Sequence, residues 1–291
     1  MTDDKDVPEG SPEPPSYAFE KLSKDLIEQV ASIAQTQTVI TRSFEAIVQP
    51  LQDAIRLTLP RLNLDLSWVH EAWVGAMPPN WRDLEPNDVD RVLTVMDETG
   101  WCLAWCPRVH IIRELLTTDT IDARERTLLG SRAAIVEDMQ ECVGGMSHSG
   151  STDYRRTVTL AISAFDAGHV EAAQALAAAE ISAIINGGFK LNFADARERF
   201  RGDPTQETVN AFREQAVLNM VARSLQRYYA DLGDPPPPGF SRHATIHSVS
   251  AEQYNEVNSL ASLLLAVAFS KEVDLLMSWR EQDPEDASTA E

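Results

Sequence analysis

The sequence predicts an all-α protein, and two observations point to this fold class. Apolar residues recur three or four positions apart through most of the chain, which is the spacing of one face of an amphipathic helix. No segment of useful length alternates apolar and polar residues as a half-buried strand does, and no internal repeat is present. Apolar residues form 43% of the 291 residues, so a large core can be buried. We therefore expect a helical N-terminal region over 16–150 and a four-helix bundle over 151–280.

Both ends of the chain differ in composition from the rest. Residues 1–15 are acidic and rich in proline, and residues 281–291 are acidic, so we expect two disordered tails. The N-terminal segment lacks the apolar core of a signal peptide, and the most apolar run, Leu260 to Phe269, is too short to span a membrane. The odd, low count of three cysteines then indicates reduced thiols, and we expect a cytoplasmic protein that does not bind a membrane.

The charge of the chain limits the partners that it can attract. The formal net charge is −20, which favours solubility and argues against general, charge-driven binding of nucleic acid. The charge is unevenly distributed, because residues 151–272 are close to neutral and their basic residues are mostly arginine. Arginine is the side chain best suited to grip phosphate, although most of these arginines are expected to be solvated on helix surfaces.

The first predicted element covers the segment from Tyr17 to Leu59. Its apolar residues follow steps of three and four, which indicates a long amphipathic helix or helix pair, with Pro50 as a kink. Such a stripe fits either a helix packed on its own domain or a dimerising coiled coil. Further along, Asn87-Asp88 is expected to cap a short helix that runs through Met96. The other predicted elements of this region are an irregular piece over 100–107 and helices over 110–116 and 121–143.

A loop rich in glycine and serine, 144–152, is the predicted boundary between the two regions. After it, two helices are predicted to form a hairpin that turns at Gly168. The return helix is rich in alanine, so the two backbones can approach closely. The predicted helices of the bundle are 153–167, 170–185, 205–232 and 251–277.

Chemistry is suggested at one place, Arg242-His243-Ala-Thr-Ile-His247, which follows the proline run 235–238 and opens the last predicted helix. Arginine can hold two phosphate oxygens, and histidine can transfer a proton near neutral pH. On an ideal helix the five-residue offset separates Arg242 and His247 by about 140° after one full turn. Convergence therefore requires Arg242 at or before the first helical turn. We expect the two side chains to lie close together, partly exposed, in a groove that His243 also reaches.

Other candidate sites are weaker. Cys102, Cys106 and His110 are spaced by four, as metal ligands on one helix face would be, but Pro107 interrupts that helix and no fourth ligand follows. We therefore expect buried or incidental cysteines, no metal and no cofactor. His148 lies in the glycine and serine loop without a local carboxylate or thiol, and is expected to sit at a disordered tip.

The α-helical pattern and the Arg/His motif together resemble the HEPN domains (higher eukaryotes and prokaryotes nucleotide-binding). Many of these bundles carry Arg, a polar residue, a short spacer and His near the start of the last helix, and Arg242-His243-x3-His247 is similar. Abortive-infection and stand-alone bacterial members of this family are similar in sequence to Phe240–His247 and to the following Tyr254 and Asn258-Ser259-Leu260. The hairpin over 155–185 resembles the same members. The resemblance covers about 153–277, and Ser248 departs from it, because glycine is common at that position.

The resemblance implies a metal-independent endoribonuclease of a toxin or phage-defence system that cleaves RNA through its own 2′-hydroxyl. It implies that His247 is the acid/base, that Arg242 stabilises the phosphorane, and that His243 positions phosphate or shares the proton transfer. Tyr254 and Asn258 would line the same face as donors for substrate binding, or would only be part of the helix surface. A homodimer, an RNA substrate and an antitoxin or defence partner are implied as well. The alternatives are a non-catalytic interaction or RNA-binding module, and a helical scaffold whose Arg242 pairs with acidic neighbours.

Overall fold

The computed structural model describes residues 75, 77–202, 211–229, 233–235, 237–247 and 250–282. Within these residues the regular elements are helices and none is a strand, which confirms the predicted class. The predicted helix over 17–59 and the tail over 1–15 lie outside the described residues. The predicted C-terminal tail begins at 281, but the last helix continues through Gln282 before the description ends.

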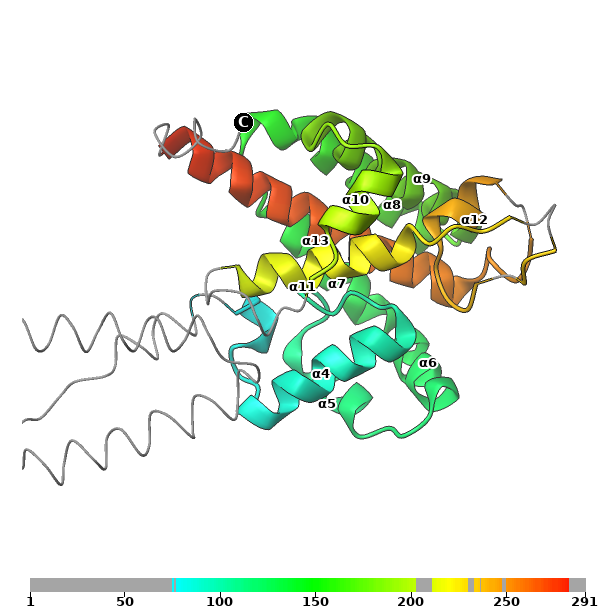
Figure 1. The fold of residues 1–291 in the computed structure, drawn as a ribbon. Coiled ribbons are helices and arrows are strands. Elements are labelled where there is room, and N and C mark those ends of the chain that lie inside the picture. The colour runs from blue at the N-terminus through cyan, green and yellow to red at the C-terminus, as the bar shows by residue number, and fades with distance from the viewer. Residues whose placement is uncertain are drawn as a thin grey trace, which may run out of the picture.

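The last helix, α13 (Glu256–Gln282), is the axis of the fold. It packs against α7 (Arg132–Gly144), α8 (Thr152–Asp166), α9 (Val170–Ala183) and α11 (Phe212–Ser224). Residues 260–270 of α13 are all buried, because neighbouring helices cover every face of this stretch. In Figure 1, α8, α9 and α10 lie above α11, and α4, α5 and α6 lie below it.

The predicted hairpin is confirmed as α8 and α9. Gly168 joins the two helices with a φ of 85°, a left-handed conformation that glycine adopts without strain. The facing sides carry the predicted apolar stripes, and α9 continues into a π-helical turn over Ile184–Gly188. The buried residues of the two stripes are Val158, Ala161, Ile162, Phe165, Ala173, Ala177 and Ile181.

In the described part of the N-terminal half, one predicted helix is divided into two. The helix expected over 121–143 is divided into α6 (Ile121–Gly130) and α7, because Gly130 is a poor helix former and Ser131 leaves the helical conformation. The Asn87-Asp88 cap is also wrong. Glu85 is the N-cap of α4 (Pro86–Thr99), and proline occupies the first turn, where its missing N–H costs nothing. The other elements are η1 (Pro79–Trp81) and α5 (Val109–Leu116), with the irregular piece over 100–107 as expected.

The C-terminal half differs more from expectation. Helix α10 (Phe193–Arg199) was not predicted, and α11 ends at Ser224 rather than at Leu232. The Arg/His motif does not open the last helix, because it forms a separate helix, α12 (Arg242–His247), and α13 begins only at Glu256. A turn held by the N–H groups of Gln253 and Tyr254, which both donate to the carbonyl oxygen of Ser250, lies between them.

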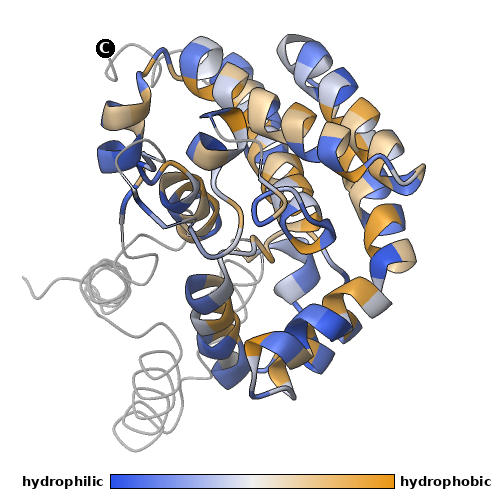
Figure 2. Cartoon of the chain, turned by 90° about the vertical axis from the view of Figure 1, so that its right-hand side faces the viewer, coloured by the Kyte–Doolittle hydropathy of each residue, from blue (hydrophilic) through white to orange (hydrophobic). Residues whose placement is uncertain are grey.

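One hydrophobic core contains residues from each of the helices α4 to α11 and α13. It extends from Met77 to Val273 and draws residues from both sides of the 144–152 loop. Most helices carry both hydrophobic and hydrophilic residues, as Figure 2 shows. The domain boundary at 144–152 stays a prediction, and the core passes across it.

Candidate functional site

Arg242 is the first residue of α12, and its side chain is directed to α9 and α10. Its Nε donates to Ser182 Oγ at 2.7 Å, and its guanidinium lies 3.9 Å from the centre of the Phe193 ring. The residue is only 9% exposed, and burial lowers the pKa of the guanidinium from its ordinary value. This corrects the expected partly exposed arginine. Because α12 packs against α9, the start of the short helix faces the protein interior.

His243 and His247 form a pair on the surface of α12. They lie four residues apart on one helix face, and their ring centres are 4.6 Å from each other. His247 is exposed, His243 is half-buried, and the exposed Tyr229 ring meets His243 edge-on at 5.8 Å. Two of the three predicted catalytic residues therefore lie together, while the third contacts other elements.

The surroundings of His243 favour its neutral form. Burial lowers the pKa of this imidazole, and the nearby charges of His247, Arg242 and Arg227 lower it further. A hydrogen bond with the backbone of Tyr228 acts in the opposite direction. A neutral imidazole has a free nitrogen lone pair, so His243 can accept a proton near neutral pH.

Tyr254 and Asn258 brace the turn between α12 and α13. The Tyr254 hydroxyl donates to the carbonyl oxygen of Thr245 at 2.7 Å. The Asn258 amide donates to the carbonyl oxygens of Gln253 at 3.0 Å and Glu252 at 3.3 Å, and Asn258 is only 4% exposed. These polar contacts use the groups that sequence reasoning assigned to substrate binding.

Two buried glutamines complete the support of α12. Gln174 on α9 donates from Nε2 to Thr245 Oγ1 and to the carbonyl oxygen of Gln253, both at 2.9 Å. Gln253 in turn donates to the carbonyl oxygens of Pro237 and Gly239, so the proline-rich turn is joined to the same network. Both glutamines are fully buried. Sequence reasoning missed them, although a glutamine among the alanines of a buried helix is an unusual choice.

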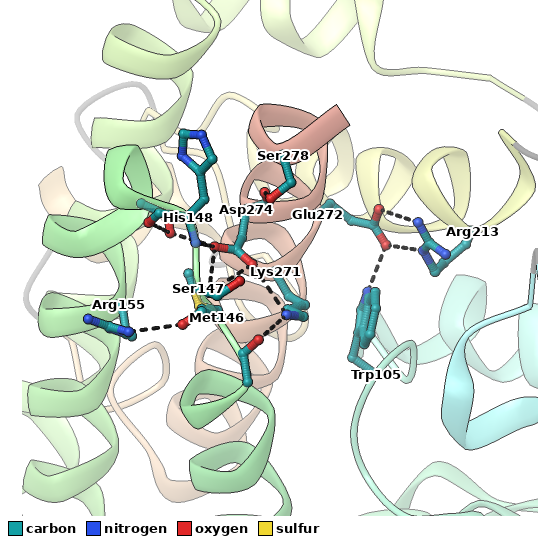
Figure 3. Close-up of polar contacts among 12 residues, drawn as sticks. Trp105, Met146, Ser147, His148, Arg155, Arg213, Lys271, Glu272, Asp274 and Ser278 are labelled. Atoms are coloured by element: carbon teal, nitrogen blue, oxygen red, sulfur yellow. Dashed lines mark hydrogen bonds and ion pairs between the residues drawn. The ribbon is translucent and has the colours of Figure 1, made fainter. Parts of the chain in front are cut away.

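A second polar cluster lies on α13 and was not predicted. Glu272 is 2% exposed and accepts from Arg213 Nε at 2.7 Å and Nη2 at 3.3 Å. It also accepts from Trp105 Nε1 at 2.7 Å, which ties the 100–107 segment to α11 and α13 (Figure 3). A buried charge pair of this kind is stable only when hydrogen bonds satisfy it, as they do here.

Asp274 anchors the 145–151 loop to the same helix. Its carboxylate accepts from the backbone N–H of Ser147 at 3.1 Å and of His148 at 2.9 Å, and from Ser151 Oγ at 2.6 Å (Figure 3). Lys271 Nζ lies 3.3 Å away. Burial alone would raise the pKa of Asp274, but the hydrogen bonds from Ser151 and His148 and the charge of Lys271 together lower it.

His148 is better ordered than the disordered tip that its sequence suggests. Besides the bond to Asp274, its Nδ1 accepts from the N–H of Gly150 at 2.9 Å, and its Nε2 lies 2.9 Å from Glu281 Oε1. The side chain is 11% exposed. The loop thus turns back onto α13, which a reading of its glycines and serines alone did not reveal.

The cysteines and His110 occupy separate environments. Cys102 and Cys106 are buried in the core, and His110 is exposed on α5. Among the described residues, no group of three or more His, Cys, Asp or Glu side chains is placed to hold a metal ion. Cys106 instead neighbours Cys142 of α7, which raises the pKa of the Cys106 thiol, and the spacing of the cysteines did not suggest this proximity.

Glu180 is a buried carboxyl group that the sequence did not single out. It lies on α9, is 2% exposed, and accepts from Ser270 Oγ of α13 at 3.5 Å. Burial raises its pKa to about 8, although hydrogen bonds with Thr157 and Ser270 oppose the shift. A carboxyl group of this kind is protonated near neutral pH.

The surface of α12 offers two adjacent imidazoles, an aromatic ring and a nearby arginine, which can bind an anion and move protons. None of the described helices is long and apolar enough to cross a membrane. Comparisons with family models, with curated proteins and with solved structures found no match for this chain.

Proposed function

We propose that this protein is a metal-independent endoribonuclease that cleaves RNA by attack of the 2′-hydroxyl, in a toxin or phage-defence setting. The observation that carries the proposal is the His243–His247 pair, whose ring centres lie 4.6 Å apart on α12. Two imidazoles at this separation can serve as base and acid in one reaction. The resemblance of the sequence over 240–260 to HEPN proteins also supports RNA cleavage.

The roles follow from the different exposure of the two histidines. His243, with its lowered pKa, takes the proton of the 2′-hydroxyl, and His247, which is exposed, protonates the leaving oxygen. Arg242 acts by position, because its side chain holds α12 on Ser182 and Phe193. Arg227 is the better candidate for phosphate, because it is exposed and close enough to lower the pKa of His243.

A homodimer belongs to the same proposal. One protomer provides few groups at α12, and a two-fold axis beside this helix would double them. Ile246 is 45% exposed next to His247, so an apolar side chain is available for such a contact. An antitoxin or defence partner would then cover the active surface.

The test is cleavage of single-stranded RNA by the purified protein in excess EDTA. We expect products with a cyclic phosphate, no cleavage of DNA, and a loss of ~10²-fold or more in His247→Ala, the usual contribution of general acid–base catalysis. His110→Ala is the matched control, because His110 is an exposed histidine on α5 and should leave the rate unchanged. Overexpression should slow growth for the wild type and not for His247→Ala.

Arginine variants separate contact with phosphate from support of α12. Arg227→Ala should reduce cleavage without a change in the urea midpoint, because Arg227 is exposed. Arg242→Lys should lower the urea midpoint as well, because lysine cannot reproduce the guanidinium contact with the Phe193 ring and Ser182.

A non-catalytic interaction module is the second candidate, and the burial of Arg242 favours it. Arg242, the arginine of the motif, contacts other helices instead of solvent. The surface of α12 would then serve to bind a partner rather than to catalyse a reaction. Absence of cleavage and of toxicity, or equal cleavage by wild type and His247→Ala, would reject the nuclease and support this module.

A further inference from the structure

Cys106 and Cys142 come together from segments that are distant in sequence. Cys106 belongs to the irregular 100–107 segment, and Cys142 is near the end of α7. The backbone N–H of Arg108, two residues after Cys106, donates to Asp138 of α7 at 2.7 Å, about one turn before Cys142, so the two segments pack together and the Cys106 thiol lies beside that of Cys142. Cys106 is 1% exposed within the core, whereas Cys142 is half-buried and packs against the core from outside. The pair therefore has one accessible thiol with a buried thiol directly behind it.

The accessible thiol lines a cavity of about 360 Å³. Its wall contains the cations Arg108 and Lys271 as well as the acids Asp138 and Glu141, and Trp105 covers one side. This space admits a molecule as small as a hydroperoxide. The thiolate is the form of a cysteine that attacks peroxides.

The three thiols of the chain are unequal in reactivity. Burial raises the pKa of Cys102 to about 12, and this residue has no exposed surface. The hydrogen bond to Cys142, and then burial, raises the pKa of Cys106 well above its usual range. Both buried thiols therefore stay protonated, and Cys142 is the thiol that an oxidant meets first.

We propose that Cys106 and Cys142 form a reversible dithiol–disulfide couple that responds to hydroperoxides, with Cys142 as the attacking thiol and Cys106 as the resolving thiol. This inference is independent of the RNA chemistry at α12. Cys142 attacks the peroxide, its sulfur bonds to one oxygen as the O–O bond breaks, and water or an alcohol leaves, which gives a sulfenic acid. Cys106 then attacks that sulfur as its thiol proton passes to the sulfenic oxygen, the S–O bond breaks, and that oxygen departs as water. The two thiols lose two electrons, the peroxide gains them, and a small thiol reverses the step.

The experiment oxidises the full chain with equimolar hydrogen peroxide, then unfolds it and alkylates the remaining thiols. We expect the free thiols to fall from three to one, the remaining thiol to be Cys102, and a peptide joining Cys106 to Cys142 to appear in the mass spectrum. Dithiothreitol should restore all three. A wild type that keeps three thiols, or that converts Cys142 to a sulfinic acid without a cross-link, would overturn the proposal.

Variants assign the two roles. Cys106→Ser should lose the cross-link and accumulate a sulfenic acid at Cys142 that dimedone traps, whereas Cys142→Ser should keep both thiols at the same dose. Cys102→Ala is the control and should form the cross-link as the wild type does. A disulfide between Cys102 and Cys106 in Cys142→Ser would contradict the assignment.

A measurement on the folded wild type does not depend on any variant. Alkylation with limiting iodoacetamide should label Cys142 at least ~10-fold faster than the buried Cys102, in line with its accessibility. Equal rates at the two positions would show that Cys142 is not the entry point and would overturn the proposal.

Discussion

Three buried carboxyl groups on α9 and α13, those of Glu180, Glu272 and Asp274, have different partners. Glu272 pairs with Arg213, whereas Asp274 accepts from backbone N–H groups and lies beside Lys271. Glu180 contacts the hydroxyl groups of Thr157 and Ser270 and has a raised pKa. Burial is similar for all three, so the partners determine the charge of each residue.

The pH dependence of stability should reveal Glu180. Its pKa is about 8 in the folded protein, above its ordinary value of 4.5, so the folded state binds the extra proton between these values. The stability that this proton supplies is full below the lower value and is lost as pH rises through about 8. Glu180→Gln, which is neutral at every pH, should show a smaller fall in the urea midpoint between about pH 5 and about pH 9 than the wild type.

Glu171→Gln is the control for this prediction, because Glu171 is exposed on the same helix. It should follow the wild-type pH profile. The prediction fails if the Glu180→Gln profile also matches the wild type.

Removal of Glu272 should be far more costly than removal of an exposed glutamate. Glu272→Ala leaves the Arg213 charge buried without its partner and should lower the free energy of unfolding by ~3–5 kcal/mol. Glu281→Ala on the same helix should cost less than ~1 kcal/mol, because the Glu281 side chain is 68% exposed in its pair with His148. Urea unfolding monitored by circular dichroism provides both values.

A double variant distinguishes charge from packing at this site. Arg213→Met with Glu272→Leu removes both charges and keeps most of the volume, so it should be more stable than Glu272→Ala alone. A double variant as unstable as the single one would show that packing, rather than the unpaired arginine, explains the loss.

At the scale of elements, the position of α12 depends on polar contacts with α9. Gln174 is fully buried and donates to Thr245 and Gln253. Gln174→Leu keeps the approximate side-chain volume but removes the donor to Thr245 Oγ1 and to the Gln253 carbonyl oxygen. It should lower the free energy of unfolding by ~1–3 kcal/mol. Amides of α12 should also exchange faster in this variant.

Gln140→Leu is the matched substitution at an exposed position of α7 and should change the free energy of unfolding by less than ~0.5 kcal/mol. If α12 amides exchange equally fast in the wild type and in Gln174→Leu, the glutamine is not what holds the helix.

Local patterns in the sequence account for the elements that were predicted correctly. The α8–α9 hairpin has two apolar stripes and a glycine between them, so it can be recognised without its neighbours. Helix α10 also carried a usable signal, since Asn192 caps it by accepting from the N–H groups of Ala194 and Asp195. Its shortness hid it, because a seven-residue helix shows too few turns for a periodicity to stand out.

The candidate site was less predictable because its contacts span long distances in sequence. The adjacency of His243 and His247 follows from helical spacing and was available from the sequence. The partner of Arg242 is Ser182, and the partners of Glu272 are Arg213 and Trp105. No local pattern encodes such pairs, since only the folded arrangement of several helices brings them together.

At the scale of the whole molecule, the core passes across the 144–152 loop. We therefore expect one cooperative unit over the described helices, in which the slowest amides of α4 and α9 exchange through the same global opening. Hydrogen exchange at increasing denaturant measures the opening free energy of each helix. A clearly lower value for α4 and α5 than for α8 and α9 would instead support two separate domains.

The central place of α13 has a consequence for how the protein is made. Helices α4 to α11 leave the ribosome before α13 does, and α7, α8, α9 and α11 bury apolar faces against it. Until residues 256–282 emerge, those faces have no partner, so the nascent chain must hold several half-covered helices in a soluble state. Synthesis that stalls before this helix should yield a chain that chaperones retain and proteases remove, however well its α8–α9 hairpin has formed.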